Sequence, residues 1–181
     1  MQTLKKEISI RKLTKDSPED LKACVRSVAA LADEIWHEHF TPIIGAEQVD
    51  YMLSKFQSED GIYADIKNGD FIYFLAEDTK RREPVAYCGV RVNEDYLLLS
   101  KLYILSGYRG EGIGRKLFDE VVALCGQVYG FKTIRLTVNK NNTGPIDVYK
   151  KIGFTVIDSV KTDIGGGFYM DDYIMEFSLS V

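Results

Sequence analysis

Cysteine and histidine are scarce in this sequence, which limits the chemistry that it can carry. The three cysteines, Cys24, Cys88 and Cys125, lie far apart inside apolar patterns, and there is neither a C-x-x-C pair nor a histidine-rich cluster. Scattered thiols of odd number are typical of buried, reduced side chains rather than of disulfides or metal sites. We therefore expect no metal centre and a reducing, cytoplasmic environment.

Long apolar runs and a strong excess of charge are also missing. No stretch approaches the roughly 20 apolar residues that a membrane-spanning helix needs, and the first lysines are not followed by the apolar region of a secretory signal. The net charge of −4 favours neither a nucleic-acid partner nor a membrane surface. A chain of 181 residues predicts a single domain, 1–181, and leaves open whether it forms a homodimer.

The most informative stretch of the chain combines an apolar run, a glycine-rich turn and a helical pattern. The run from Tyr96 to Leu105 is rich in strand formers and predicts a strand buried on both faces. After the turn, apolar residues recur at helical spacing, at Ile113, Leu117, Val121 and Leu124. A strand, a turn and a helix are therefore expected in that order.

The turn itself has the sequence Arg-Gly-Glu-Gly-Ile-Gly-Arg and predicts a site for phosphate groups. Glycines at alternate positions let the backbone approach a ligand closely, and the first turn of a helix offers unpaired N–H groups. An arginine at each end suits a pyrophosphate. The expected phosphate-binding residues are Arg109, Gly110, Glu111, Gly112, Ile113, Gly114 and Arg115.

Two other nucleotide-binding loops fit the turn less well. A Walker loop needs a lysine followed by Ser or Thr after its last glycine, whereas Arg115 and Lys116 follow here. The dinucleotide fingerprint has a longer spacing before its last glycine. An ATP-binding module is kept as an alternative, although the chain offers it neither the lysine nor an obvious carboxylate for Mg²⁺.

The N-terminal region predicts a strand followed by a long helix. Alternating apolar residues predict the strand from Glu7 to Leu13. Ser17 can cap a helix whose first residue is Pro18, with acidic residues in the first turn. The helix is expected to end at Thr41, because the residue before a proline is pushed towards extended geometry.

The rest of the chain predicts a mixed α/β sheet. Periodicity indicates further helices at residues 47–56, 58–67 and 145–152, and further strands at 71–76, 84–93, 133–138, 154–160 and 168–179. Short connections between the strands from 71 to 105 imply an antiparallel meander. The helix that follows the glycine turn joins the strands at 96–105 and 133–138, which should therefore be parallel neighbours.

Two motifs together resemble the GNAT family of N-acetyltransferases. The glycine turn is similar to the family's Q/R-x-x-G-x-G/A motif, with matches at Arg109, Gly112 and Gly114. The stretch 142–154 is similar to its N-x-x-A-x-x-x-Y-x-x-x-G-F motif, with matches at Asn142, Tyr149, Gly153 and Phe154. Pro145 replaces the alanine at a first-turn position, where proline is tolerated.

The resemblance implies a fold and a cosubstrate. The GNAT fold has a central mixed sheet of six to seven strands, helices on both faces and two splayed parallel strands in the middle. Acetyl-CoA would lie at the splay, with its pantetheine arm paired to the backbone of Leu102, Tyr103 and Ile104, and with Asn142 as a hydrogen-bond partner. No glycine or proline in the apolar run marks the bulge that would separate the strands.

The resemblance also implies transfer of an acetyl group from the thioester directly to a primary amine, on a small molecule or a peptide. Tyr149 matches the tyrosine that protonates the departing thiolate, although its spacing alone also fits a core aromatic residue. The general base stays open among Glu34, Glu38, His37, His39 and Asp171. A catalytically weak acetyl-CoA-binding regulatory domain is the alternative function.

The acceptor site is the least determined part of the prediction. In the family, the segment 36–56 and the C-terminal hairpin shape this site, which makes its candidates Trp36, His37, His39, Phe40 and Tyr169. Residues two apart do not share a helix face, so His39 continues the apolar face, as a core or a pocket residue, and His37 should point elsewhere. The layout is somewhat similar to bacterial polyamine acetyltransferases, but the acceptor could equally be an antibiotic, an amino acid, a peptide or a protein.

Overall fold

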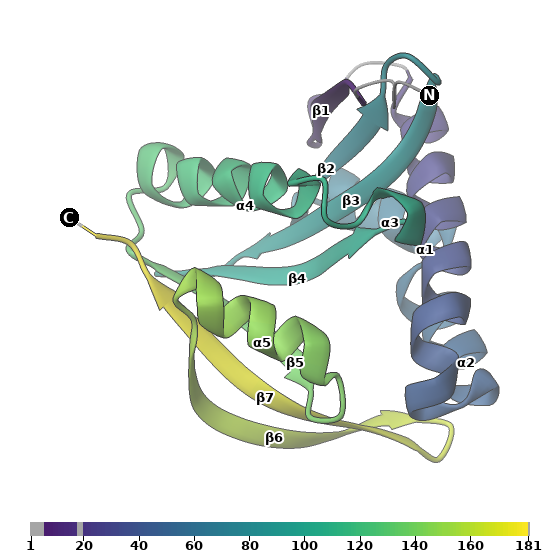
Figure 1. Cartoon of the computed structure of the whole chain (residues 1–181), viewed down its shortest axis with the longest axis vertical. Helices are drawn as coiled ribbons and strands as arrows, with labels where there is room; N and C mark the ends of the chain where they lie inside the picture. Colours follow the sequence, from purple (N-terminus) through teal and green to yellow (C-terminus); the bar gives the residue numbers. More distant parts are fainter. Residues whose placement is uncertain (1–5, 18–19, 181) are drawn as a thin grey trace.

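The chain forms a seven-stranded mixed sheet with helices on both faces (Figure 1). The computed structural model describes residues 6–17 and 20–180. The strand order is β1-β2-β3-β4-β5-β7-β6. The strands are β1 (Ile8–Leu13), β2 (Phe71–Asp78), β3 (Glu83–Val92), β4 (Leu97–Ile104), β5 (Thr133–Asn139), β6 (Thr155–Gly165) and β7 (Phe168–Ser178). The predicted fold class, antiparallel meander and parallel β4–β5 pair are confirmed.

Alternating side chains along the central strands produce two separate cores. Along β2, Tyr73 and Leu75 face the helices of one layer, whereas Phe74 and Ala76 face those of the other. The first layer contains α1 (Leu21–Ile44), α2 (Ala46–Phe56) and α3 (Glu59–Lys67). The second contains α4 (Ile113–Ala123) and α5 (Thr143–Ile152), with a 3-10 turn at Ser106–Tyr108 before α4 and a π-helical turn at Leu124–Val128 after it.

The parallel strands β4 and β5 separate soon after they meet, as the family resemblance predicts (Figure 1). Their pairing is limited to Leu97 with Ile134 and Leu98 with Arg135. Ser100 is an extra residue in the pairing of β4 with β3, because Leu99 and Lys101 oppose consecutive residues of β3. This bulge lies where the strands begin to diverge, and it leaves the β5-facing edge of residues 99–104 without a neighbouring strand.

Helix α1 differs from its prediction at both ends. It continues through Pro42 to Ile44 rather than ending at Thr41, because Ile43 and Ile44 still pack against the apolar core of this layer. At its start, the oxygen of Ser17 accepts a hydrogen bond from the Thr14 N–H at 2.8 Å and does not cap the helix. Asp20 precedes the first helical residue, and the predicted first position, Pro18, lies outside the described residues.

Strand β6 is longer than predicted and forms the outer edge of the sheet. It runs to Gly165 instead of residue 160, so the hairpin turn is confined to Gly166 and Gly167. The glycine and charged residues of the stretch 161–165 are typical of a loop, but pairing with β7 makes this stretch part of the strand.

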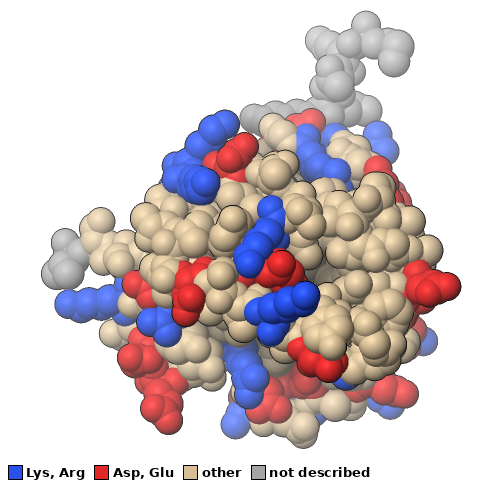
Figure 2. All heavy atoms as spheres, turned by 90° about the horizontal axis from the view of Figure 1, so that it is seen from below, with Lys and Arg blue, Asp and Glu red and all other residues tan. Residues whose placement is uncertain are grey.

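On the face shown in Figure 2, acidic and basic side chains are interspersed. Over residues 6–17 and 20–180, no helix is long and apolar enough to cross a membrane.

Candidate active site

A cavity of about 1060 Å³ occupies the gap between the separated strands. Helices α1, α2 and α3 contribute one part of its wall, on one face of the sheet. The glycine turn before α4, together with α5, contributes the other part. The exposed edge of β4 lies between the two parts, with Leu102, Tyr103 and Ile104 in the lining. Two molecules that enter from opposite faces can therefore meet at this edge.

The glycine turn has the geometry of a phosphate cradle. Gly110 and Gly112 have φ values of 79° and 77°, which glycine adopts without strain. A Cβ atom added at either glycine would meet no atom of the described residues within 4 Å, so none of these residues fills the space beside the backbone. Helix α4 begins directly afterwards, and no side chain caps its N-terminus. The first-turn N–H groups are therefore available to an anion such as a pyrophosphate.

The predicted cradle residues do not all face the cavity. Arg109, Gly110, Gly114 and Arg115 line it. Glu111 instead forms an ion pair with Lys6 at 3.2 Å, and Ile113 is buried in the core below α4. Glu111, Gly112 and Ile113 can therefore contribute backbone N–H groups rather than side chains.

Both arginines of the turn have hydrogen-bond partners. The Nε of Arg109 donates to the carbonyl oxygen of Ile104 at 3.1 Å. The Nε of Arg115 donates to Asp119 Oδ1 at 2.9 Å, one helical turn along α4. The first contact ties the glycine turn to the end of β4, and it occupies one carbonyl at the strand edge that was predicted to pair with the cosubstrate.

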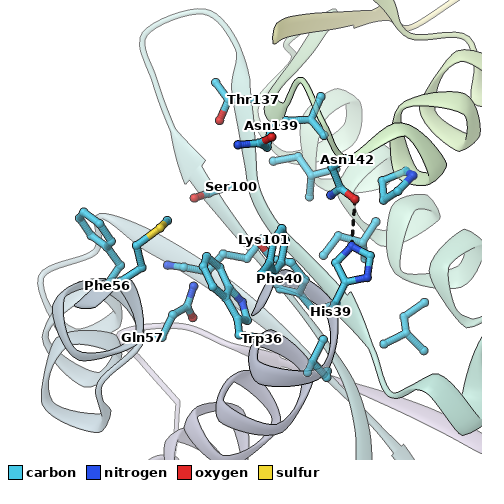
Figure 3. A pocket seen from close by; sticks show the side chains of 18 of the residues that line it. Trp36, His39, Phe40, Phe56, Gln57, Ser100, Lys101, Thr137, Asn139 and Asn142 are labelled. Atoms are coloured by element: carbon cyan, nitrogen blue, oxygen red, sulfur yellow. Dashed lines mark hydrogen bonds between the residues drawn. The ribbon is translucent and has the colours of Figure 1, made fainter. Parts of the chain in front are cut away.

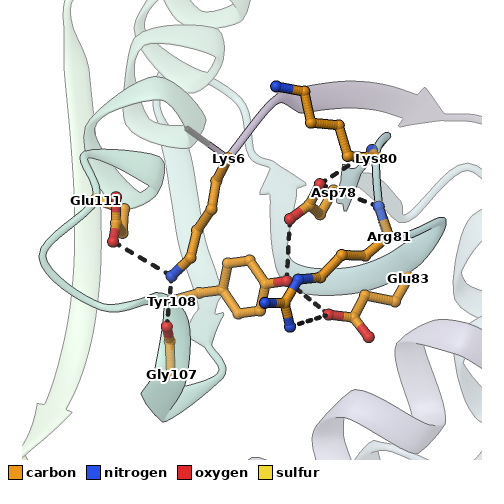
Figure 4. Close-up of polar contacts among 8 residues, drawn as sticks. All are labelled: Lys6, Asp78, Lys80, Arg81, Glu83, Gly107, Tyr108 and Glu111. Atoms are coloured by element: carbon orange, nitrogen blue, oxygen red, sulfur yellow. Dashed lines mark hydrogen bonds and ion pairs between the residues drawn. The ribbon is translucent and has the colours of Figure 1, made fainter. Parts of the chain in front are cut away.

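Tyr108 anchors the start of the cradle to the turn between β2 and β3 (Figure 4). Its hydroxyl lies 3.1 Å from Asp78 Oδ2 and 2.6 Å from Glu83 Oε1. Lys6 Nζ lies 4.2 Å from the centre of the Tyr108 ring and donates to the Gly107 carbonyl at 2.7 Å. Burial raises the pKa of Asp78, but hydrogen bonds from Tyr108 and from two backbone N–H groups outweigh it, so the pKa lies below its usual value. An ionised Asp78 is a strong acceptor for Tyr108.

Tyr149, the predicted general acid, lies on α5 and lines the cavity. Its ring contacts Phe154 edge-on, with the ring centres 5.6 Å apart. In the described part of the chain its hydroxyl has no hydrogen-bond partner. Burial raises the pKa of Tyr149 above its ordinary value, so the phenol keeps its proton at neutral pH. The site thus contains an aromatic side chain packed through its ring, with a free O–H donor.

Three of the predicted acceptor-site residues come together on the wall opposite (Figure 3). Trp36 and Phe40 have ring centres 4.6 Å apart, and Trp36 lies 5.5 Å from the ring of Tyr103 on β4. His39 Nε2 donates to Oδ1 of Asn142 at 2.9 Å. All five of these residues line the cavity, so helix α1 and the residue that precedes α5 meet across it.

The other two predicted acceptor residues, His37 and Tyr169, do not line this cavity. His37 hydrogen-bonds the Asp33 carbonyl and Asp50 Oδ1, each at 2.8 Å, and these bonds raise its pKa above the ordinary value. Tyr169 is half exposed and lies under Lys161 on β6, with Nζ 5.2 Å from the ring centre. His37 thus points towards α2, which agrees with the helix-face argument.

The predicted general-base candidates separate in the same way. Glu34, Glu38 and Asp171 are exposed and absent from the cavity wall, so His39 is the one predicted candidate that lines it. A further candidate, Asp172, escaped the sequence analysis. This carboxyl group is buried, lines the cavity, and has its pKa raised to about 6 by burial and by the neighbouring Asp171.

Two more cavity residues were missed, Gln57 and Lys101. Both side chains are buried, with exposed fractions of 5% and 6%. Lys101 could have been noticed, because a charged residue inside an otherwise apolar strand is unusual. Gln57 follows α2 and gives no comparable signal. Across the described ranges, no three His, Cys, Asp or Glu side chains are grouped as metal ligands.

A mixed sheet with two splayed parallel strands, a glycine cradle at the splay and a tyrosine on the following helix defines the fold class of the coenzyme A-dependent N-acetyltransferases. The comparison of sequences agrees with the geometry. The model of the Acetyltransferase (GNAT) family matches residues 29–154, and the chain belongs to this family. The predicted family is thereby confirmed.

Individual relatives resemble parts of the chain or its fold. The "Probable N-acetyltransferase san" of Drosophila melanogaster is 37% identical over 67 residues, which cover 37% of this chain and 36% of that protein. The "N-alpha-acetyltransferase 50" of Danio rerio is 36% identical over 69 residues, 38% of this chain and 41% of that protein. The chain thus spans about two-fifths of the length of these curated relatives.

Among solved structures, a PaiA N-acetyltransferase from Thermoplasma acidophilum, in complex with coenzyme A, superposes with a TM-score of 0.75. The match covers 95% of this chain and 99% of that one, at 23% sequence identity. At this identity the likeness concerns the fold, which it confirms over nearly the whole chain.

Proposed function

We propose that the protein is an acetyl-CoA-dependent N-acetyltransferase that acts on a primary amine of a small molecule or peptide. The observation that carries the proposal is that the open glycine cradle and the free Tyr149 hydroxyl face one cavity, at the point where β4 and β5 separate. Acetyl-CoA supplies the acetyl group as an activated thioester. The three buried, free cysteines support a reducing compartment such as the cytoplasm.

The cofactor half of the cavity fits this cosubstrate. The N–H groups of the cradle and the two arginines beside it would hold the pyrophosphate. The edge of β4 from Leu102 to Ile104, where Arg109 already bonds the Ile104 carbonyl, has no neighbouring strand and would pair with the amide groups of the pantetheine arm. Asn142, buried at the start of α5, would hydrogen-bond the arm from the other side.

The acceptor amine must lose a proton before it attacks, and the departing thiolate must gain one. Asp172 is suited to accept the first proton, because a buried carboxylate with a pKa of about 6 is ionised at neutral pH and still basic. Tyr149 is suited to donate the second, because its phenol is protonated and has no other acceptor. None of the cysteines lines the cavity, which supports direct transfer between the two molecules.

A regulatory domain that binds acetyl-CoA without useful turnover would need the cradle alone. It would have no use for a buried carboxylate and an unpaired phenol on the same cavity wall. These two groups are the reason for preferring the enzyme. The relatives' names, an N-alpha-acetyltransferase and a PaiA N-acetyltransferase, do not agree on one acceptor.

Two measurements test the proposal. Acetyl-CoA should raise the melting temperature, because a ligand that binds only the folded state stabilises it, whereas ATP should not. An acceptor panel containing amino acids, polyamines and short peptides should then give amine-dependent release of free thiol. A shift with ATP alone would contradict the family's cosubstrate, and a shift with acetyl-CoA but no thiol release would favour the regulatory domain.

A further inference from the structure

We infer that the acceptor is an amine that also bears a carboxylate, and that Lys101 and the Gln57 amide bind this carboxylate at the α2–α3 end of the cavity. The inference rests on the proposed function and names its substrate class. It concerns the wall made by α1, α2 and α3, across the sheet from the glycine cradle (Figure 3).

Lys101 is a buried amine with unused donors. Its Nζ donates to the Tyr73 hydroxyl at 2.6 Å and lies 4.4 Å from the ring centre of Phe71. An ammonium group has three N–H donors, and Tyr73 is the one acceptor within hydrogen-bond distance among the described residues. Among the described residues, no carboxylate oxygen lies within 4.0 Å of Lys101 Nζ, the limit for an ion pair. The buried ammonium therefore has donor capacity directed at the cavity that it lines.

Gln57 is held in an orientation that complements Lys101. The hydroxyl of Tyr87 donates to Gln57 Oε1 at 3.4 Å, which leaves the amide nitrogen as a donor. In the described part of the chain this nitrogen has no partner, although the side chain is buried and lines the cavity. The Gln57 nitrogen and the remaining Lys101 donors are open to the cavity, and on the same wall the buried Nε1 of Trp36 also lacks a hydrogen-bond partner among the described residues. Donors without acceptors on one cavity wall indicate a ligand that accepts from them.

A glycine opposite Lys101 on the neighbouring strand leaves space for the contact between Lys101 and Tyr73. Gly89 on β3 pairs with Lys101, and a Cβ atom at Gly89 would lie 3.2 Å from the Tyr73 ring and 3.3 Å from Lys101 Cδ. Any larger residue at this position would push the Tyr73–Lys101 pair aside. The bulge at Ser100 directs the Lys101 side chain to this face of the sheet, together with Tyr103.

The charge of this wall favours an anion over a second cation. Lys55, Arg91 and Lys101 contribute three positive charges, and Asp65 contributes one carboxyl group. The pKa of Lys101 is lowered to about 8, mainly by burial, so the amine is still largely protonated at neutral pH. A carboxylate can accept from Lys101 and Gln57 together, whereas a polyamine would bring another ammonium group against Lys101. The inference therefore favours a carboxylate-bearing amine over the polyamine acceptor to which the family resemblance gave some weight.

Matched acceptors test the inference on the unaltered protein. Ornithine, ornithinamide and putrescine share a primary amine on similar carbon chains, but only ornithine has a carboxylate. We expect kcat/KM for ornithine to exceed that for putrescine and ornithinamide by about 10- to 100-fold, the range of a charge-assisted hydrogen bond to a buried group. Equal values for the three acceptors would overturn the inference while leaving the acetyltransferase intact.

Variants then locate the effect. Lys101→Met keeps the length of the side chain and removes the ammonium group, so kcat/KM for ornithine should fall about 10- to 100-fold and that for putrescine should change by less than about threefold. Gln57→Glu should oppose the carboxylate and reverse the preference. Lys67→Met is the matched control, because this exposed lysine of α3 bonds the Lys15 carbonyl away from the cavity.

The outcomes separate the two proposals. A normal melting shift with acetyl-CoA and equal loss for all acceptors in Lys101→Met would assign Lys101 a structural role and contradict the carboxylate site. If acetyl-CoA binds but no amine is acetylated, the proposed function is contradicted, and the inference, which depends on it, is contradicted as well. If Lys101→Met does not fold, the acceptor series and Gln57→Glu still decide.

Discussion

His39 on α1 and Asn142 at the start of α5 are 103 residues apart in the sequence, yet Nε2 of the first donates to Oδ1 of the second across 2.9 Å. The contact joins helix α1 to the start of α5 across the cavity. It also fixes the proton of a neutral His39 on Nε2, because Oδ1 of an amide can only accept. Asn142 is thereby oriented before any cosubstrate arrives.

Removal of this contact should weaken the cofactor site. In His39→Ala the Asn142 side chain loses one hydrogen bond, worth about 1 kcal/mol, so the Kd of acetyl-CoA should rise about 3- to 10-fold. Calorimetric titration measures the change. His37→Ala is the matched control, since His37 lies on the same helix and bonds Asp50 away from the cavity. Equal effects in both variants would show that α1, rather than this contact, determines the affinity.

Tyr149→Phe separates chemistry from packing. The ring stays against Phe154 and the lost hydroxyl has no hydrogen-bond partner among the residues that the structure describes, so the melting temperature should hardly change. Turnover should fall about 10²- to 10³-fold if the phenol protonates the thiolate. Thiol release under conditions where chemistry limits the rate measures this. Turnover close to that of the unaltered protein would assign proton delivery to water and leave Tyr149 a packing role.

Asp172 predicts the acidic side of the pH profile. Its pKa is raised to about 6, so the general base is protonated below that pH and ionised above it, and kcat/KM should rise with pH through about 6. In Asp172→Asn this rise should disappear, and turnover near pH 7 should fall about 10²-fold or more. A variant that keeps the same pH dependence would exclude Asp172 as the base and return His39 to that role.

The cradle can be tested by substitution of two glycines that have similar positive φ values. Gly112 and Gly130 have φ values of 77° and 68°, and neither would meet an atom within 4 Å of an added Cβ. Each change to alanine should destabilise the fold by about 1 kcal/mol. Only Gly112→Ala should also raise the Kd of acetyl-CoA, by about tenfold or more, because its methyl group enters the space for phosphate. Equal affinities would place the phosphates elsewhere.

Lys101 predicts an unusual dependence of stability on pH. Its pKa is lowered from 10.5 to about 8. Between these pH values the unfolded chain therefore binds more protons than the folded chain. The contribution of Lys101 to the free energy of unfolding thus increases as the pH rises. At pH 7 the penalty is about 3 kcal/mol, and the bond to Tyr73 offsets part of it. Lys101→Met should therefore be more stable by about 2 kcal/mol at pH 7, and the gain should shrink by pH 10. Urea unfolding at both pH values measures the difference. A less stable variant at pH 7 would contradict the burial penalty.

The part of the cavity that we propose for the cofactor could be assembled from the sequence because its residues belong to short local motifs. The glycine turn, the helix after it and the helix that contains Tyr149 each follow from a short motif, and the structure places all three at one cavity. The separation of β4 and β5 came from the resemblance. The position of the bulge could not be predicted, because the run from Tyr96 to Leu105 contains no glycine or proline to mark it. The glycine at the bulge, Gly89, lies on the partner strand β3.

The acceptor side was less predictable because distant segments build it. Gln57 follows α2, Lys101 lies on β4 and Asp172 on β7, and only the strand order brings these residues to one cavity. The sequence analysis included Asp171 among five open candidates for the general base, whereas the neighbouring Asp172 is the buried residue, a one-residue difference that reverses the face of a strand. On helix α1, His37 and His39 are two residues apart and point in different directions, so His39 lines the cavity and His37 does not.

The two residue pairs between β4 and β5 also affect how the molecule deforms. Strands β1 to β4 and strands β5 to β7 form two half-sheets, each built from a continuous part of the chain, and few backbone hydrogen bonds span the seam. Backbone pairing therefore contributes little to holding the halves together at this line, where side chains of both halves pack in one apolar core. A ligand that pairs with β4 and contacts α5 would act as a strut across the seam. Occupation of the cavity would then make the whole sheet stiffer.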